Sequence, residues 1–311
     1  MNARRLVNGH LGFVCALLLM SAPSYADESH VVVSIKPLHS LVAAVMEGDG
    51  EPTLLVDGAS SPHSFNLRPS QIEALQHADI VFYDDDYFEF FLRRVLQHLP
   101  PQTQRVALAE SPGIRTYKLR MRGLWNQPSG DNPFSEMPDL HLWLDPQNAI
   151  AMAHNIETVL SDRYPDKRAL YQANAARLIV QLQVLNAELH QRMAPLQSTP
   201  FIVFHDAYQY FEKAYHLNAL GCITFSPELM LSPRHVIEVK HLIAAQQVHC
   251  VFSEPSMDPR MVQTLAGDET IRSATLDPEA TLLAPGKGLY FTLMHQMADG
   301  FVQCLQPVIK P

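Results

Sequence analysis

The chain has 311 residues, and its 23 Lys and Arg side chains against 32 Asp and Glu give a formal net charge of -9. This balance argues against a nucleic-acid partner, because binding to a phosphate backbone favours an excess of basic side chains. An acidic balance is compatible with cation binding, but it is equally ordinary for a soluble bacterial protein.

Residues 1–26 have the pattern of a secretory signal peptide. Arg4 and Arg5 precede an apolar stretch from Leu11 to Met20, and Ser24-Tyr25-Ala26 offers a small-x-small cleavage site. The apolar stretch has about half of the roughly 20 residues that a membrane-spanning helix needs. We therefore expect an exported, periplasmic protein from which this leader has been removed.

Apolar runs typical of strands alternate with helical patterns through the rest of the chain. The strand-like runs are Val31–Pro37, Thr53–Gly58, Ile80–Asp86, Phe201–His205 and His249–Ser256. The helical patterns are Leu38–Met46, Pro69–Ala78, Tyr87–Leu99, Asp206–Tyr215, Pro233–Gln247, Pro259–Asp268 and Tyr290–Cys304. This alternation predicts an α/β fold in which helices cover the faces of parallel sheets.

The 285 residues that remain after the leader exceed what one hydrophobic core usually organises, so two lobes are expected. The segment from Asp166 to Met193 contains no Gly or Pro and places four leucines at helical spacing: Leu178, Leu182, Leu185 and Leu189. A helix of about 40 Å should therefore connect the lobes. We expect an N-terminal lobe at 27–160, the linking helix at 161–197 and a C-terminal lobe at 198–311.

Three cysteines follow the leader: Cys222, Cys250 and Cys304. An oxidising compartment would let two of them pair, but their spacing does not say which. A zinc-thiolate site is the alternative, although the chain contains no C-x-x-C motif.

Three histidines lie beside apolar runs in distant parts of the chain: His63, His141 and His205. Neutral imidazole is the commonest transition-metal ligand, and three imidazoles with one oxygen donor would complete a tetrahedral zinc site. His205 ends a predicted strand, where ligands bind in parallel α/β sheets. Asp277 is the candidate oxygen donor, and its alternative role is that of a turn residue before Pro278.

With 15 histidines in the chain, most must have other roles. Any one of them, taken alone, is more often a hydrogen-bonded surface or core residue than a ligand. Seven fall within helical patterns, where an exposed helix face accounts for them: His77, His98, His154, His190, His235, His241 and His295.

Four motifs occur in an order and spacing that resemble a known family: Gly58–Gln71 (GASSPHSFNLRPSQ), Asp139–Pro146 (DLHLWLDP), Phe204–Leu217 (FHDAYQYFEKAYHL) and Leu276–Pro278 (LDP). They are similar to the zinc-specific solute-binding proteins of bacterial ABC importers, the ZnuA-like group, over essentially the whole mature chain. The resemblance implies two α/β lobes joined by a rigid helix, one Zn(II) in the cleft between them, and delivery of the ion to a membrane permease by a monomer.

Carried over motif by motif, the resemblance implies that His63, His141 and His205 are ligands, with Asp277 as an oxygen ligand or near neighbour. It also implies a disulfide between Cys250 and Cys304. Glu279 follows the LDP motif where relatives usually have small or apolar residues, so either Asp277 or Glu279 supplies the oxygen, unless water does.

Two further departures concern the loops. Many zinc members carry a His-rich loop before the second ligand, whereas Tyr117 to Pro138 has no histidine and offers Arg120, Arg122 and Trp125. An auxiliary metal-capturing loop is therefore not expected. Some members also place a glutamate before the first histidine, where this chain has Pro62, which cannot ligate through its side chain.

Three alternatives differ in metal or in function. Manganese and iron relatives typically have a carboxylate at the position of His205, and a nitrogen-rich site favours zinc over manganese. A three-histidine zinc hydrolase would need an open fourth position and a general base, and the chain has no H-E-x-x-H motif. An exported adhesin or metal buffer without a transporter is the third alternative.

Overall fold

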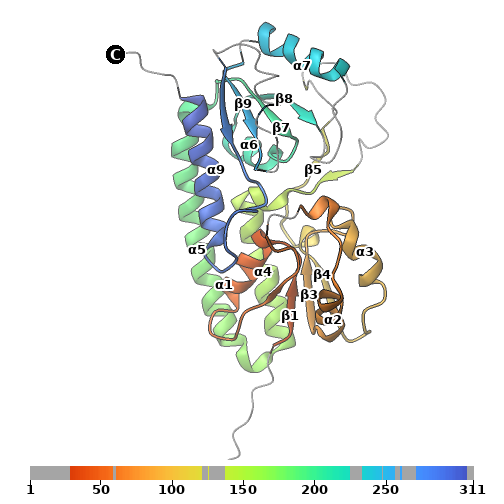
Figure 1. The fold of residues 1–311 in the computed structure, drawn as a ribbon. Helices are drawn as coiled ribbons and strands as arrows, with labels where there is room; N and C mark the ends of the chain where they lie inside the picture. The colour runs from red at the N-terminus through yellow and green to blue at the C-terminus, as the bar shows by residue number, and fades with distance from the viewer. Residues whose placement is uncertain are drawn as a thin grey trace, which may run out of the picture.

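The computed structural model describes residues 29–58, 61–120, 125, 137–224, 233–246, 248–255, 260 and 271–306. The predicted leader and most of the helical pattern at 259–268 lie outside these residues. The described part forms two α/β lobes, one above the other in Figure 1, with two long helices running beside both. The predicted fold class is confirmed.

The N-terminal lobe is built on a parallel sheet with the strand order β2-β1-β3-β4. Its strands are β1 (Val31–Val33), β2 (Thr53–Leu54), β3 (Ile80–Tyr83) and β4 (Gln104–Ala107). Every side chain of β1 is buried, as are the first three of β3. Such unbroken apolar runs are expected where helices cover both faces of a parallel sheet.

The helices of this lobe are α1 (Lys36–Val45), α2 (Pro69–His77), α3 (Phe90–Leu96) and α4 (Pro146–Arg163), with 3-10 turns η1 (Pro62–Ser64), η2 (Leu108–Glu110) and η3 (Leu142–Leu144). Proline occupies the first turn of α1, α2 and α4, where its missing N–H costs nothing. The side chain of Asp145 caps α4 by accepting a 2.8 Å hydrogen bond from the Gln147 N–H. The sequence Asp145-Pro146 therefore encodes the start of α4.

The C-terminal lobe repeats this plan with the strand order β10-β9-β7-β8, again all parallel. Its elements are β7 (Phe201–His205), α6 (Gln209–Tyr215), β8 (Ala219–Thr224), α7 (Pro233–Ala245), β9 (Cys250–Ser253) and β10 (Arg272–Thr275). Cys250 in β9 forms a disulfide with Cys304, as predicted. Cys222 is buried in β8, outside the disulfide.

Two helices join the lobes along one side of the molecule, α5 (Arg168–Met193) and α9 (Leu289–Leu305). The 3-10 turns η4 (Pro165–Lys167) and η5 (Ala194–Leu196) flank α5. At 1.5 Å per residue, α5 is about 40 Å long, and the four predicted leucines are buried on one of its faces. One hydrophobic core extends from Val31 through α5 to Leu305, so the lobes share a core.

The junction between the lobes is crossed by a two-stranded antiparallel ribbon of β5 (Tyr117–Lys118) and β6 (Pro138–Asp139). The Tyr117 N–H donates to the Tyr210 hydroxyl, and that hydroxyl donates to the Asp139 carbonyl at 2.7 Å. The ribbon thereby places Asp139, and His141 after it, against α6 of the other lobe. Within the described residues, no helix combines the length and apolar character needed to cross a membrane.

Candidate metal centre

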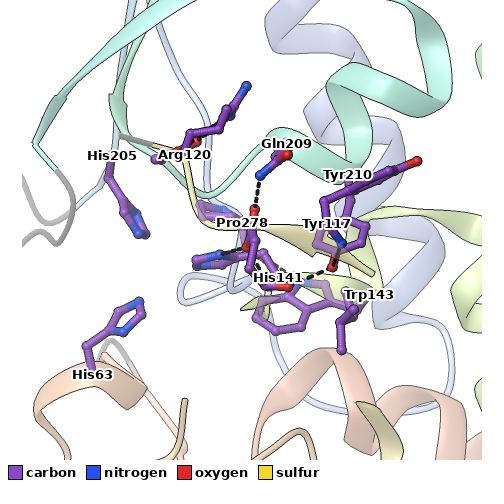
Figure 2. A network of polar contacts seen from close by, with 12 residues as sticks. His63, Tyr117, Arg120, His141, Trp143, His205, Gln209, Tyr210 and Pro278 are labelled. Atoms are coloured by element: carbon purple, nitrogen blue, oxygen red, sulfur yellow. Dashed lines mark hydrogen bonds and ion pairs between the residues drawn. The ribbon is translucent and has the colours of Figure 1, made fainter. Parts of the chain in front are cut away.

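The three predicted histidines converge between the lobes. His63 lies on η1, His141 immediately precedes η3, and His205 ends β7. Their ring centroids are 5.1 to 5.8 Å apart, and one ligand atom from each lies within 4.8 Å of the others. Figure 2 shows the three rings turned toward a common space.

Each of these rings has a buried nitrogen left for a ligand. The Nε2 atoms of His63, His141 and His205 have no hydrogen-bond partner among the described residues. A buried polar atom without a partner is costly, so three at one point require an explanation. A metal ion that accepts three lone pairs would satisfy all of them together.

Carboxylates on the far side of two rings set the direction of those lone pairs. His141 Nδ1 lies 2.9 Å from Asp139 Oδ1, and His205 Nδ1 lies 3.1 Å from Glu254 Oε1. A carboxylate accepts only an N–H, so in the neutral ring the proton sits on Nδ1 and the lone pair on Nε2. Both histidines are therefore in the tautomer that binds metal through Nε2.

The two carboxylates are themselves held in place. Asp139 Oδ2 accepts a 3.1 Å hydrogen bond from Gln209, and its Oδ1 accepts from the His141 N–H. Glu254 Oε1 accepts from the Tyr208 hydroxyl at 3.0 Å. Sequence reasoning missed both acids. Their positions in the sequence could have indicated them. Asp139 lies two residues before the candidate ligand His141, and Glu254 follows β9 at the same edge of the sheet where β7 ends in His205.

Aromatic rings form the apolar wall of the site. The buried ring of Phe88 contacts His63 and His141 edge-on, with centroids 4.8 and 5.3 Å away. Trp143 lies 5.5 Å from His141. These rings exclude water from one side, which strengthens electrostatic interactions within the site.

The histidines differ in their affinity for protons. Burial, and then the neighbouring rings of His205 and His141, hold the pKa of His63 well below its ordinary value. Burial also acts to lower the pKa of His205, but the adjacent Glu254 carboxylate outweighs it and raises that pKa. His63 is thus ready to bind metal as a neutral ring, whereas at His205 a proton competes with the metal.

Two carboxylates approach the site from the segment after β10. Glu279 Oε1 lies 3.6 Å from His63 Nε2. Asp277 instead uses Oδ2 to accept from the Thr281 hydroxyl at 3.0 Å and the Leu282 N–H at 3.2 Å. Its Oδ1 is buried without a hydrogen-bond partner among the described residues. Neither acid belongs to the group of atoms within 4.8 Å that the three imidazoles form.

The Tyr117 to Pro138 loop contributes a cation beside the site. Arg120 forms ion pairs with Asp206 and Glu212, and its guanidinium lies 3.3 Å from the centre of the Trp125 ring. Burial acts to lower the pKa of Arg120, but the two carboxylates outweigh it and raise that pKa. These contacts anchor the loop to the residue that follows His205. Arg122, the other arginine of this loop named above, lies outside the described residues.

Comparisons with known proteins agree with this architecture. A family model described as zinc-uptake complex component A, periplasmic, matches residues 31–304. The high-affinity zinc uptake system protein ZnuA of Brucella abortus (strain 2308) is 36% identical over 308 residues, covering 90% of this chain and 92% of its own length. The ZnuA of Paracoccus denitrificans (strain Pd 1222) is 30% identical, covering 95% of this chain and 97% of its own length.

Solved structures share the fold. A crystal structure of ZnuA covers 90% of this chain and 100% of its own, with a TM-score of 0.75 and 23% identity. The Zn(II)-bound ZnuA-like domain of Streptococcus pneumoniae AdcA covers 89% of this chain and 98% of its own, with a TM-score of 0.70 and 19% identity.

The fold and the site together define a two-lobed α/β protein with a nitrogen-rich candidate metal centre between its lobes. More particularly, the chain belongs to the periplasmic zinc-uptake component A family, the ZnuA family. Members of this family are solute-binding components of zinc importers rather than enzymes.

Proposed function

We propose that this chain binds one Zn(II) between its lobes and delivers the ion to the membrane permease of an ABC importer. In this proposal the leader at 1–26 is cleaved, and the mature protein works in the periplasm as a monomer. The observation that carries the proposal is the convergence of three buried Nε2 atoms that have no hydrogen-bond partner among the described residues. Zinc is the cargo here, so the site must hold it firmly and still release it.

The proposed ligands are the Nε2 atoms of His63, His141 and His205. Zinc prefers tetrahedral coordination with Zn–N bonds of about 2.0–2.1 Å, which places neighbouring nitrogen atoms about 3.4 Å apart. The present separations of up to 4.8 Å are somewhat larger. Binding therefore requires the separations between ligand nitrogens to shorten by up to about 1.4 Å, through rotation of the side chains.

We assign the fourth donor to Glu279 and give Asp277 a different role. The Glu279 carboxylate already lies beside His63 Nε2, whereas Asp277 is engaged with Thr281 and Leu282 of its own loop. Asp277 then braces the loop that carries Glu279. The carboxylate reduces the positive charge of the bound ion and closes the coordination sphere.

The donor set favours zinc over manganese. Three imidazoles suit a borderline metal, whereas manganese prefers sites rich in carboxylate oxygen. A hydrolase would instead keep one zinc position open for water. Closure of the fourth position by a carboxylate, together with membership of a transport family, favours carriage of the ion over catalysis.

The test is metal analysis of the purified mature protein after zinc and manganese have been offered in competition. We expect one zinc per chain and little manganese, measured by mass spectrometry of the metal content and of the intact complex. Preferential loading with manganese, or a chain that binds neither ion, would overturn the proposal.

A further inference from the structure

The segment from Asp277 to Leu283, here called the strap, belongs to the C-terminal lobe by sequence but is bound by the N-terminal lobe. It follows β10 and carries both candidate carboxylates. The Trp143 indole N–H donates a 2.8 Å hydrogen bond to the Pro278 carbonyl. Figure 2 shows Trp143 and Pro278 beside His141.

Lys36 holds the strap at its other end. Its ammonium group donates to the carbonyls of Thr281 at 2.8 Å, Leu283 at 2.9 Å and Ala280 at 3.4 Å. Lys36 is the first residue of α1, about 245 positions earlier in the chain, and is only 4% exposed. An ammonium has three N–H donors, and the strap carbonyls use all three.

The strap needs an external support because its backbone is strained. Ala280 has a φ angle of 56°, in the left-handed region that a residue with a Cβ rarely adopts. Strain of this kind persists only where surrounding contacts determine the conformation, and it gathers at functional sites. Here the supporting contact reaches the carbonyl of the strained residue itself, through Lys36.

Lys36 also borders the metal centre. It lines a small cavity together with Pro62, in the turn that carries His63, and Glu279, the proposed fourth donor. Burial lowers the pKa of the Lys36 amine, and the charges of Asp57 and Asp277 oppose that change. These acids offset part of the cost of burying a cation beside a metal site.

We propose that Lys36 is a positioning residue for zinc: by binding the carbonyls of Ala280, Thr281 and Leu283, it fixes the strap so that Glu279 faces His63. This inference rests on the proposed function, because it assumes that Glu279 ligates zinc. Lys36 does not touch the ion. Its effect on zinc is transmitted through the backbone of the strap.

The test compares Lys36→Met with Lys287→Met. Lys287 also joins the segment before α9 to the region after α1, through an ion pair with Glu47, but it contacts no strap carbonyl in the described structure. We expect Lys36→Met to weaken zinc binding by up to about tenfold, because a residue that acts through Glu279 cannot cost more than the loss of Glu279 itself. Lys287→Met should bind zinc as the parent protein does.

Cobalt substitution separates positioning from a merely structural role. In Co(II)-loaded Lys36→Met, water should replace the carboxylate, so the visible absorption should change in the same way as in Glu279→Gln. The double variant should bind zinc no more weakly than Glu279→Gln alone. If Lys36→Met does not fold, Lys36→Gln, which keeps an amide donor, is measured in the same way and should show a smaller change in the same direction.

Two outcomes would overturn the inference. One is a folded Lys36 variant with the parent's zinc affinity and cobalt spectrum. The other is a loss of affinity that adds fully to that of Glu279→Gln, since independent effects imply that Lys36 does not act through Glu279. A parent protein that binds no zinc would instead refute the proposed function, so the two failures are distinguishable.

Discussion

Glu254 Oε1 lies 3.1 Å from Nδ1 of His205, although the two residues are 49 positions apart; His205 ends β7, and Glu254 directly follows the neighbouring strand β9. This contact raises the pKa of His205 against the effect of burial and directs its Nε2 toward the other two histidines. The carboxylate therefore strengthens the imidazole as a ligand and also makes it a better proton acceptor.

Replacing this carboxylate should have two separable effects. In Glu254→Gln, zinc affinity at neutral pH should fall by about tenfold to a hundredfold, because a neutral amide oxygen orients His205 less firmly than the carboxylate does. The pKa of His205 should also fall, because only the weaker effects of Asp206 and Asp139 then oppose burial, so proton competition should begin at a lower pH than in the parent. Chelator competition at several pH values measures both effects. Glu238→Gln, at an exposed acid of the same lobe, is the control and should change neither.

The imidazoles should matter more than the carboxylate. His63→Ala, His141→Ala and His205→Ala should each lower zinc affinity by at least about a hundredfold, more than the loss of a residue that only orients a ligand. Glu279→Ala should cost about tenfold, because water can replace a carboxylate at the fourth position. Competition with a zinc chelator gives these values. Unchanged affinity in His205→Ala would contradict the assignment, and a larger loss in Asp277→Ala than in Glu279→Ala would return the fourth donor to Asp277.

Metal preference should follow the donor at position 205. His205→Asp replaces a borderline nitrogen by a hard oxygen, so the ratio of zinc to manganese affinity should fall. The measurement is competition between the two ions, followed by metal analysis. His205→Asn is the control: asparagine has the size of aspartate but no charge, so it separates the effect of the anionic oxygen from the effect of losing the imidazole ring.

A buried acid in the N-terminal lobe should make stability depend on pH. Burial raises the pKa of Glu89 to about 8, and burial together with the Glu89 charge raises the pKa of Asp84 well above its ordinary value. Between about pH 4.5 and 8, the folded protein keeps a proton on Glu89 that the unfolded chain has lost. The free energy of unfolding should therefore fall as the pH rises, by up to about 1.4 kcal/mol per pH unit for this group.

Urea unfolding of the metal-free protein from pH 5 to pH 8, with the disulfide intact, measures this slope. Glu89→Gln carries no titrating proton at this position, so its free energy of unfolding should decline less steeply with pH. Equal slopes in the two proteins would contradict the raised pKa of Glu89.

Metal binding should leave the arrangement of the lobes nearly unchanged. The helix α5 runs from Arg168 to Met193 without Gly or Pro, so it offers no flexible hinge between the lobes. The lobes also share one hydrophobic core, which resists their separation. Small-angle scattering of the zinc-free and zinc-bound protein should give nearly equal radii of gyration. A large decrease on zinc binding would indicate a flexible clamshell instead.

The alternation of strands and helices could be predicted from the sequence, because parallel sheets covered on both faces require unbroken apolar runs such as Val31–Val33. The three histidines could be predicted as ligands because they lie near strand ends or beside apolar runs within family motifs. Asp139 and Glu254 could not be identified from the sequence, because an acid in a loop has many possible roles. Their role as partners of His141 and His205 depends on contacts that only the folded chain makes.

The fourth donor shows a different limit of the sequence. The tripeptide Leu-Asp-Pro occurs at 144–146 and again at 276–278. In the first copy the aspartate caps a helix, and in the second it binds Thr281 and Leu282. The same three residues thus serve different local structures, and the tripeptide alone did not reveal that Glu279 would lie nearer to His63.

Because Lys36 and Trp143 fasten the strap to the first half of the molecule, the proposed donors are not divided between the lobes in chain order. Glu279 follows β10 but is held by the N-terminal lobe, whereas His205 ends β7 of the C-terminal lobe. Since the lobes share one hydrophobic core, an acceptor would take the ion by displacing its donors one at a time rather than by parting the lobes.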